Sequence, residues 1–230
     1  MKEQYYKYEV DMKFMNILAL LSFIPLGVII VIFSDFFSKT FESDIYYLYL
    51  IGLILYFFLH EIFHGIGYSI YAKNKKNIKY GIALEKGVLY ALCQERISKQ
   101  GIIVSLLFPV IFLTIIPIII AISFSFPTLM LYAFLNLIGA VADITMCILI
   151  LKLPNDIEYI DYNSDIGAYF ISETNIENIK IKGFKCVETG IHSDSKIDKS
   201  IKKFTITKGS IPFIVIYVLV VVLNIIKVLI

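Results

Sequence analysis

Residues 46–72, YYLYLIGLILYFFLHEIFHGIGYSIYA, decide how this chain folds. A helix of roughly 20 apolar residues is long enough to cross a bilayer, and this stretch exceeds that length. Within it, His60, Glu61 and His64 form a His-Glu-x-x-His sequence. Residues four apart lie on one face of a helix, so both imidazoles can reach one metal ion. Because ionisable side chains are costly to bury in hydrocarbon, the group predicts a functional site inside the membrane.

The composition is that of a polytopic membrane protein. Apolar side chains make up 58% of the chain and charged ones 17%. The formal net charge of +2 is close to zero, and we expect no nucleic-acid partner. The cysteines, Cys93, Cys147 and Cys186, are dispersed without a C-x-x-C pair. This pattern argues against both a disulfide framework and a cysteine zinc site.

Several apolar segments reach the length of a membrane span, namely 14–33, 46–72, 101–124, 127–151 and 210–230. We therefore predict an all-α polytopic membrane protein with about five transmembrane helices. Pro25, Pro109 and Pro117 lie inside spans, where we expect them to kink or locally unwind the helix. Pro127 and Pro212 stand where the first turn of a helix accepts proline.

Basic residues are distributed unevenly among the connecting segments. The N-terminal tail and segments 73–100 and 152–209 are rich in lysine, whereas segment 34–45 carries only Lys39. Because basic residues accumulate in cytoplasmic loops, we expect the N-terminus and both long basic segments to face the cytoplasm. The C-terminus would then emerge on the other side of the cell membrane. The many lysines and isoleucines favour a bacterial source.

Two segments outside the spans are expected to contain strands. The apolar runs 78–84 and 88–93, on either side of Glu85-Lys86-Gly87, predict a small cytoplasmic β-hairpin. Segment 152–209 is polar and has β-like runs at 167–171 and 179–184. It predicts a small, mostly β cytoplasmic segment.

A catalytic zinc site needs a third protein ligand beside the two histidines. The only other ionisable residue in the interior of a predicted span is Asp143. At about 1.5 Å of rise per residue, His64 and Asp143 each lie about 13 Å from the basic residues that end their spans. Their matching depth predicts one Zn²⁺ held by His60, His64 and Asp143. Glu61 is then placed to act as a general base.

Other polar and small residues surround these ligands in the sequence. On a continuous helix, Asn136 shares a face with Asp143 and can bond a substrate carbonyl or stabilise an oxyanion. A purely structural role remains an alternative for both residues. Asn136 could form an interhelical hydrogen bond, and Asp143 could be a neutral or paired residue in helix packing. Gly65 and Gly67 would let helices approach closely. We expect His192 to be a solvated surface residue.

The motifs His60-Glu61-x-x-His64 and Asn136-x-x-Gly139-Ala140-x-x-Asp143 resemble those of the DUF3267 family of zincin peptidases. That family is similar to the site-2 class of intramembrane metalloproteases. The later run Leu153-Pro154 … Asp161 … Gly167 fits the end of the family's domain. The resemblance implies zinc at the two histidines and Asp143, with Glu61 as general base. Two features of well-known site-2 proteases are missing: a Leu-Asp-Gly sequence, replaced here by Ala142-Asp143-Ile144, and a PDZ insertion.

The resemblance divides the chain into four parts. Residues 1–45 hold the N-terminal tail, first span and external loop, and residues 46–170 hold a zincin-like membrane peptidase domain. Residues 171–209 form a cytoplasmic segment, and residues 210–230 the C-terminal transmembrane helix.

We expect a zinc-dependent intramembrane peptidase that hydrolyses membrane-embedded or membrane-proximal protein or peptide substrates in the lipid bilayer. The alternative is a non-enzymatic membrane protein that uses the same groups for metal binding or cation transport. That alternative is disfavoured because the sequence has no internal repeat and few further polar residues to line a path. A third possibility is a structural or immunity-type protein with a degenerate site. It is disfavoured because every expected metal group is present.

Overall fold

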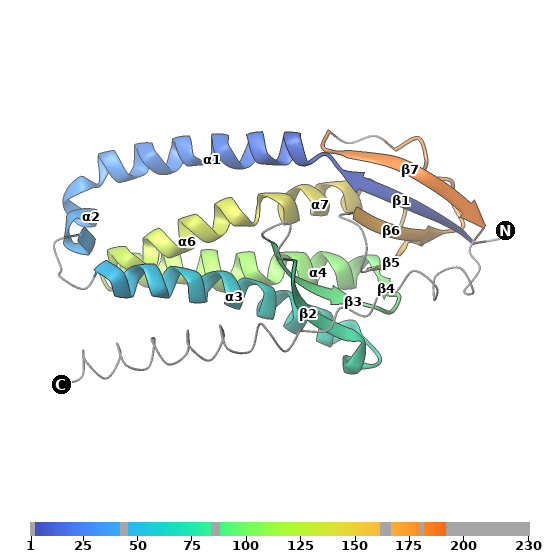
Figure 1. Cartoon of the computed structure of the whole chain (residues 1–230), viewed down its shortest axis with the longest axis horizontal. Coiled ribbons are helices and arrows are strands. Elements are labelled where there is room, and N and C mark those ends of the chain that lie inside the picture. The colour runs from blue at the N-terminus through green and yellow to red at the C-terminus, as the bar shows by residue number, and fades with distance from the viewer. Residues whose placement is uncertain (1–2, 42–45, 84–87, 162–166, 180–181, 192–230) are drawn as a thin grey trace.

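The computed structural model describes residues 3–41, 46–83, 88–161, 167–179 and 182–191. In this part of the chain, long helices lie side by side and a β-sheet stands at one end of them (Figure 1). The predicted span at 210–230, Pro212, His192 and the Glu85-Lys86-Gly87 turn all lie outside the described residues.

The predicted helices at 14–33 and 46–72 form close to their expected bounds. They are α1, Met12–Ile32, and α3, Tyr46–Tyr71, and a short helix, α2, Ser34–Phe41, follows α1. The side chain of Asp11 starts α1 by accepting a hydrogen bond from the backbone N–H of Phe14 at 3.1 Å. Helix α1 exposes large apolar side chains such as Val31, at 74%, which suits contact with lipid and not with water.

The other two spans are not regular helices. The segment Lys99–Ser123 consists of α4, Lys99–Val110, a π-helical turn, Ile111–Ile115, and α5, Ile116–Ser123. The expected local unwinding therefore occurs between Pro109 and Pro117. The last segment consists of α6, Pro127–Gly139, and α7, Val141–Lys152, bent by 49°. The described residues thus contain three helices long enough to cross a membrane, or up to four if the bent pair is one span.

A five-stranded sheet has the strand order β4-β5-β6-β1-β7. Its strands are β1, Gln4–Val10; β4, Ile97–Ser98; β5, Glu158–Ile160; β6, Gly167–Ser172; and β7, Phe184–Ile191. Strand β1 pairs antiparallel with both β6 and β7. Alternate residues of β1, Tyr6 and Tyr8, are buried, and the Tyr8 hydroxyl donates to the carbonyl of Ile176 at 2.6 Å. The fold is mostly helical as predicted, but the N-terminal tail is a strand and the β part is larger than expected.

This sheet joins strands from all three lysine-rich segments. Strand β1 comes from the N-terminal tail, β4 from the end of segment 73–100, and β5 to β7 from the segment after α7. The three segments therefore lie at the same end of the helices, as the charge pattern requires. Which side of the membrane they face stays a prediction.

The predicted hairpin is present as β2, Ile78–Ala83, paired antiparallel with β3, Val88–Cys93. Both strands contact α3. The carboxylate of Glu95 accepts hydrogen bonds from the backbone N–H of Asn74 and from Asn77 Nδ2, which ties the end of β3 to the turn after α3. The predicted strand at 179–184 was wrong in its described part, because Lys182 and Gly183, at φ +96°, form a turn and β7 begins only at Phe184. Residues 180–181 lie outside the described residues.

Candidate metal centre

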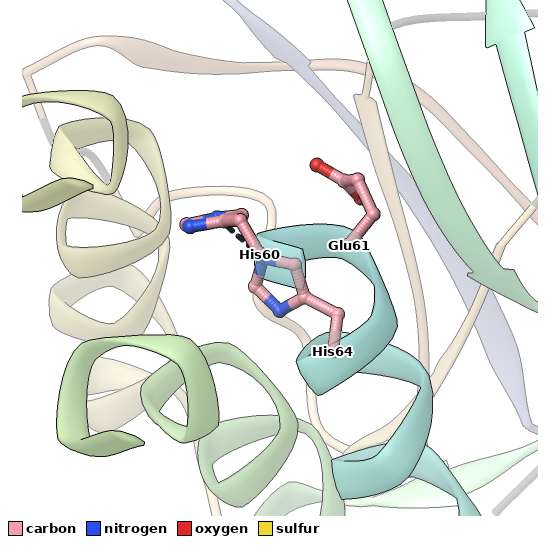
Figure 2. A group of neighbouring side chains, drawn as sticks. All are labelled: His60, Glu61 and His64. Carbon is pink, nitrogen blue, oxygen red and sulfur yellow. Dashed lines mark hydrogen bonds between the residues drawn. The ribbon is translucent and has the colours of Figure 1, made fainter. Parts of the chain in front are cut away.

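Helix α3 carries two buried histidines one turn apart. The side chains of His60 and His64 point toward each other, and Glu61 extends beside them from the same helix (Figure 2). Their Nε2 atoms lie 3.0 Å apart, and the two residues are 8% and 6% exposed. The i, i+4 spacing therefore brings both imidazoles to one point, as expected from the sequence.

Asp143 reaches the same point from another helix. It lies in the first turn of α7, where a helix N-terminus favours negative charge. Its Oδ2 is 3.1 Å from Nε2 of His60 and 3.5 Å from Nε2 of His64. The structure thus brings together the three residues that the sequence predicts as zinc ligands.

These three atoms have the spacing of ligands around one zinc ion. Ligands about 2.0–2.1 Å from zinc at the corners of a tetrahedron lie about 3.4 Å from one another. The observed separations are 3.0, 3.1 and 3.5 Å. Two imidazoles and one carboxylate are a donor set of catalytic zinc sites, in which the fourth position is left for water or substrate. The residues therefore fit a zinc ion.

Glu61 is the other carboxylate near the histidines, and its ligand atom lies within 4.8 Å of theirs. It follows His60 directly in the helix, so its side chain leaves the helix about 100° around from that of His60. Asp143 lies closer to both Nε2 atoms than this limit. Both carboxylates therefore lie close enough to the histidines to serve a metal, and Asp143 is the one with contacts of 3.1 and 3.5 Å to their Nε2 atoms.

Hydrogen bonds at the other ring nitrogens orient both histidines. His60 Nδ1 donates to Asn136 Oδ1, and His64 Nδ1 donates to the carbonyl oxygen of Ser105, each at 2.9 Å. Since both partners are acceptors, each Nδ1 carries a proton, and each Nε2 is the nitrogen that points toward Asp143. The chain therefore holds both rings in an orientation that leaves Nε2 for a metal.

The Asn136 amide is engaged at both ends inside the chain. Its oxygen accepts from His60, and its Nδ2 donates to Thr114 Oγ1 at 3.0 Å and to the carbonyl of Pro109 at 3.3 Å. Asn136 is 1% exposed. These contacts indicate that Asn136 orients His60, and they leave no part of its amide for the expected contact with a substrate carbonyl.

The expected common face of Asn136 and Asp143 assumed a continuous helix, and this assumption was wrong. The chain bends at Ala140, between α6 and α7, so the two residues stand on different helices. Both still meet His60, with Asn136 at Nδ1 and Asp143 at Nε2. The bend therefore lets two nearby residues approach opposite sides of one imidazole.

Close helix packing brings α3 to α4. A Cβ atom on Gly67 would lie 2.6 Å from Cα of Ser105, so only glycine fits at this crossing. Gly65 serves a different contact from the one expected, because Tyr80 of the hairpin covers it. Sequence reasoning missed Ser105 and Thr114, whose only signal is that each is polar within an apolar span.

Comparison with protein families gives a match over part of the chain. A model of the DUF3267 family, described as "Putative zincin peptidase", matches residues 53–157. Comparisons with curated proteins and with solved structures gave no match. The matched segment contains His60, Glu61, His64, Asn136 and Asp143, together with the whole hairpin. Residues 53–157, which carry the complete candidate metal centre, thus match the family that the sequence motifs resemble.

Proposed function

We propose that this protein is a zinc-dependent peptidase that cleaves membrane-embedded or membrane-proximal protein or peptide substrates. The observation that carries the proposal is the buried triangle of His60 Nε2, His64 Nε2 and Asp143 Oδ2, with Glu61 beside it. The family match supports a metallopeptidase. The position of this triangle on long apolar helices supports cleavage in the bilayer, as in the site-2 class.

In this proposal each residue has one task. His60, His64 and Asp143 hold the zinc ion, which when bound acts as a Lewis acid toward the scissile carbonyl and the attacking water. Glu61 accepts the proton of that water and delivers it to the leaving amine. Asn136 keeps His60 in its ligand tautomer. No nucleic acid takes part, and the partners are the lipid bilayer and a membrane protein or peptide.

The hairpin offers a place for the substrate. A helical substrate must unwind before its peptide bond can be attacked, and an extended segment can add to the edge of a sheet. Strand β3 packs against α3, the helix that carries Glu61. We place the unwound substrate segment along this hairpin, next to Glu61.

Replacing Glu61 with glutamine tests the peptidase proposal. Glutamine keeps the size of the side chain but cannot accept the proton, and loss of a general base costs about a hundredfold to ten-thousandfold in rate. We expect Glu61→Gln to retain zinc, measured by elemental analysis, and to stop the accumulation of fragments from a co-expressed helical membrane substrate. Glu173→Gln, at an exposed position, is the matched control and should behave as the unchanged protein.

Three outcomes would count against the proposal or its assignments. If Glu61→Gln cleaves at the rate of the unchanged protein, a zincin mechanism is wrong. If it loses zinc as well as cleavage, Glu61 is itself a ligand, and the assignment of Asp143 has to be reopened. A protein that binds zinc but releases no fragments in either form favours the non-enzymatic alternative.

A further inference from the structure

Two prolines of the third span leave carbonyl groups without their usual helical partner. Proline has no backbone N–H, so the carbonyl four residues earlier loses its donor. For Pro109 that carbonyl belongs to Ser105, and for Pro117 it belongs to Leu113. Both carbonyls accept a hydrogen bond from α3 instead. Ser105 accepts from Nδ1 of His64 at 2.9 Å, and Leu113 accepts from the hydroxyl of Tyr56 at 2.6 Å.

The two contacts repeat with the same spacing along both helical segments. The prolines are eight residues apart, and so are their α3 partners, Tyr56 and His64. The two helical segments run antiparallel, since the earlier α3 residue meets the later carbonyl. Each free carbonyl therefore meets a donor at the same spacing along α3.

Burial makes these contacts matter energetically. Ser105 is 0% exposed and Leu113 is 5% exposed, and hydrocarbon supplies no water to satisfy a carbonyl. A buried backbone acceptor without a partner is costly, so each freed carbonyl favours the side chain that donates to it. For Ser105 that side chain is His64, one of the proposed zinc ligands.

Pro109 is also linked to the other histidine, His60, through Asn136. Its own carbonyl oxygen accepts from Nδ2 of Asn136 at 3.3 Å, and the other end of that amide accepts from Nδ1 of His60. One proline thus affects both imidazoles: through its missing N–H at His64 and through its carbonyl, by way of Asn136, at His60. Pro117 has no such contact with a proposed ligand among the described residues.

We propose that Pro109 is a positioning residue of the metal centre, because it frees the Ser105 carbonyl to hold His64 in its ligand tautomer. This inference rests on the proposed zinc site. An amide N–H at position 109 would compete for the Ser105 carbonyl and would weaken its bond from His64. The ring of His64 would then be free to tilt or to move its proton to Nε2, and a protonated Nε2 cannot bind a metal.

Pro109→Ala tests this inference by zinc affinity, which is independent of peptidase activity. Loss of the hydrogen bond behind a ligand histidine lowers metal affinity by about tenfold to a hundredfold, and we expect a decrease in that range. Pro117→Ala is the matched control. It restores an N–H in the same span, but toward the Leu113 carbonyl, and should leave zinc affinity unchanged. Alanine favours a regular helix at both positions, so both variants should fold.

Two further measurements distinguish positioning from a general change in helix shape. Nitrogen NMR of the histidine rings, at saturating zinc, should show a hydrogen-bonded Nδ1–H on His64 in the unchanged protein and a weakened Nδ1–H hydrogen bond in Pro109→Ala. Replacement of residue 109 by the α-hydroxy analogue of alanine gives a backbone ester, which lacks both the N–H and the ring. That ester should restore zinc affinity to within a few-fold of the unchanged protein.

The inference is wrong if Pro109→Ala binds zinc as tightly as the unchanged protein. It is also wrong if both alanine variants lose affinity equally, or if the ester variant folds but stays weak, because the proline ring and its bend would then be responsible. An unchanged protein that binds no zinc overturns the metal centre itself. That failure is distinct, because it appears before any variant is compared.

Discussion

Replacing Asn136 with alanine distinguishes a residue that orients a metal ligand from one that binds substrate. In the structure the amide joins three groups, with distances of 2.9 Å to His60, 3.0 Å to Thr114 and 3.3 Å to Pro109. Alanine removes all three contacts and leaves the Nδ1–H of His60 without its acceptor in a buried site. We therefore expect both the stability of the helix packing and the affinity for zinc to fall.

The magnitudes follow from these contacts. Interhelical hydrogen bonds in membrane proteins contribute about 0.6 kcal/mol on average, so three of them amount to about 2 kcal/mol of unfolding free energy. Loss of the hydrogen bond behind a ligand histidine costs about tenfold to a hundredfold in metal affinity. That range corresponds to about 1.4 to 2.7 kcal/mol of binding free energy.

The assay is competition for zinc between purified protein in detergent and a fluorescent chelator, together with an unfolding titration. Asn16→Ala is the matched control, because Asn16 is an exposed asparagine on the apolar helix α1. It should change neither quantity. If Asn136→Ala binds zinc as tightly as the unchanged protein and only cleavage slows, Asn136 acts on the substrate and our reading of its contacts is refuted.

Three further predictions follow from other parts of the structure. Gly67→Ala places a methyl group 2.6 Å from Cα of Ser105, so it should destabilise the protein by about 1–3 kcal/mol in an unfolding titration. The control Gly27→Ala, whose added methyl group would have nothing within 4 Å, should not destabilise it, and equal effects of the two variants would contradict the tight crossing of α3 and α4. Burial raises the pKa of Asp161 to about 6, above its unfolded value near 3.9, so the contribution of Asp161 to stability should be fully present below about pH 4 and fall by about 2–3 kcal/mol as the pH rises to about 6. Asp161→Asn should abolish this part of the pH dependence, and an unchanged pH profile would refute the assignment. A cysteine at the exposed position of Lys76 should escape an impermeant maleimide in intact cells and react after permeabilisation; labelling from outside would reverse the proposed orientation.

The geometry of the centre was predictable where local periodicity determines it. The four-residue spacing of His60 and His64 fixes their common face on any helix. The depth of Asp143 depends only on its distance from the end of its span, so it was predicted without knowledge of the packing. The bend at Ala140 was not predictable in this way, because nothing in an apolar run with one glycine before it specifies an angle of 49°.

Two further features could not be predicted from the sequence because they depend on contacts between distant parts of the chain: the pairing of β1 and the partner of the Ser105 carbonyl. Strand β1 pairs with residues more than 150 positions later in the chain. The only local sign of this strand in the sequence is the spacing of Tyr6 and Tyr8, whose side chains are both buried in the structure. Pro109 was recognised as a disturbance of its helix, but the partner of the Ser105 carbonyl depends on how α3 packs against α4. That packing needs Gly67, whose role appears only once the two helices are placed.

The central claim is that two histidines and one aspartate hold a single zinc ion. The most direct measurement is zinc K-edge X-ray absorption on purified protein, combined with elemental analysis of the unchanged protein and Asp143→Ala. We expect about one zinc per chain, two imidazole ligands at about 2.0–2.1 Å, and a marked loss of zinc in the variant. A spectrum without imidazole scattering, or equal zinc in Asp143→Ala, would contradict the proposed centre.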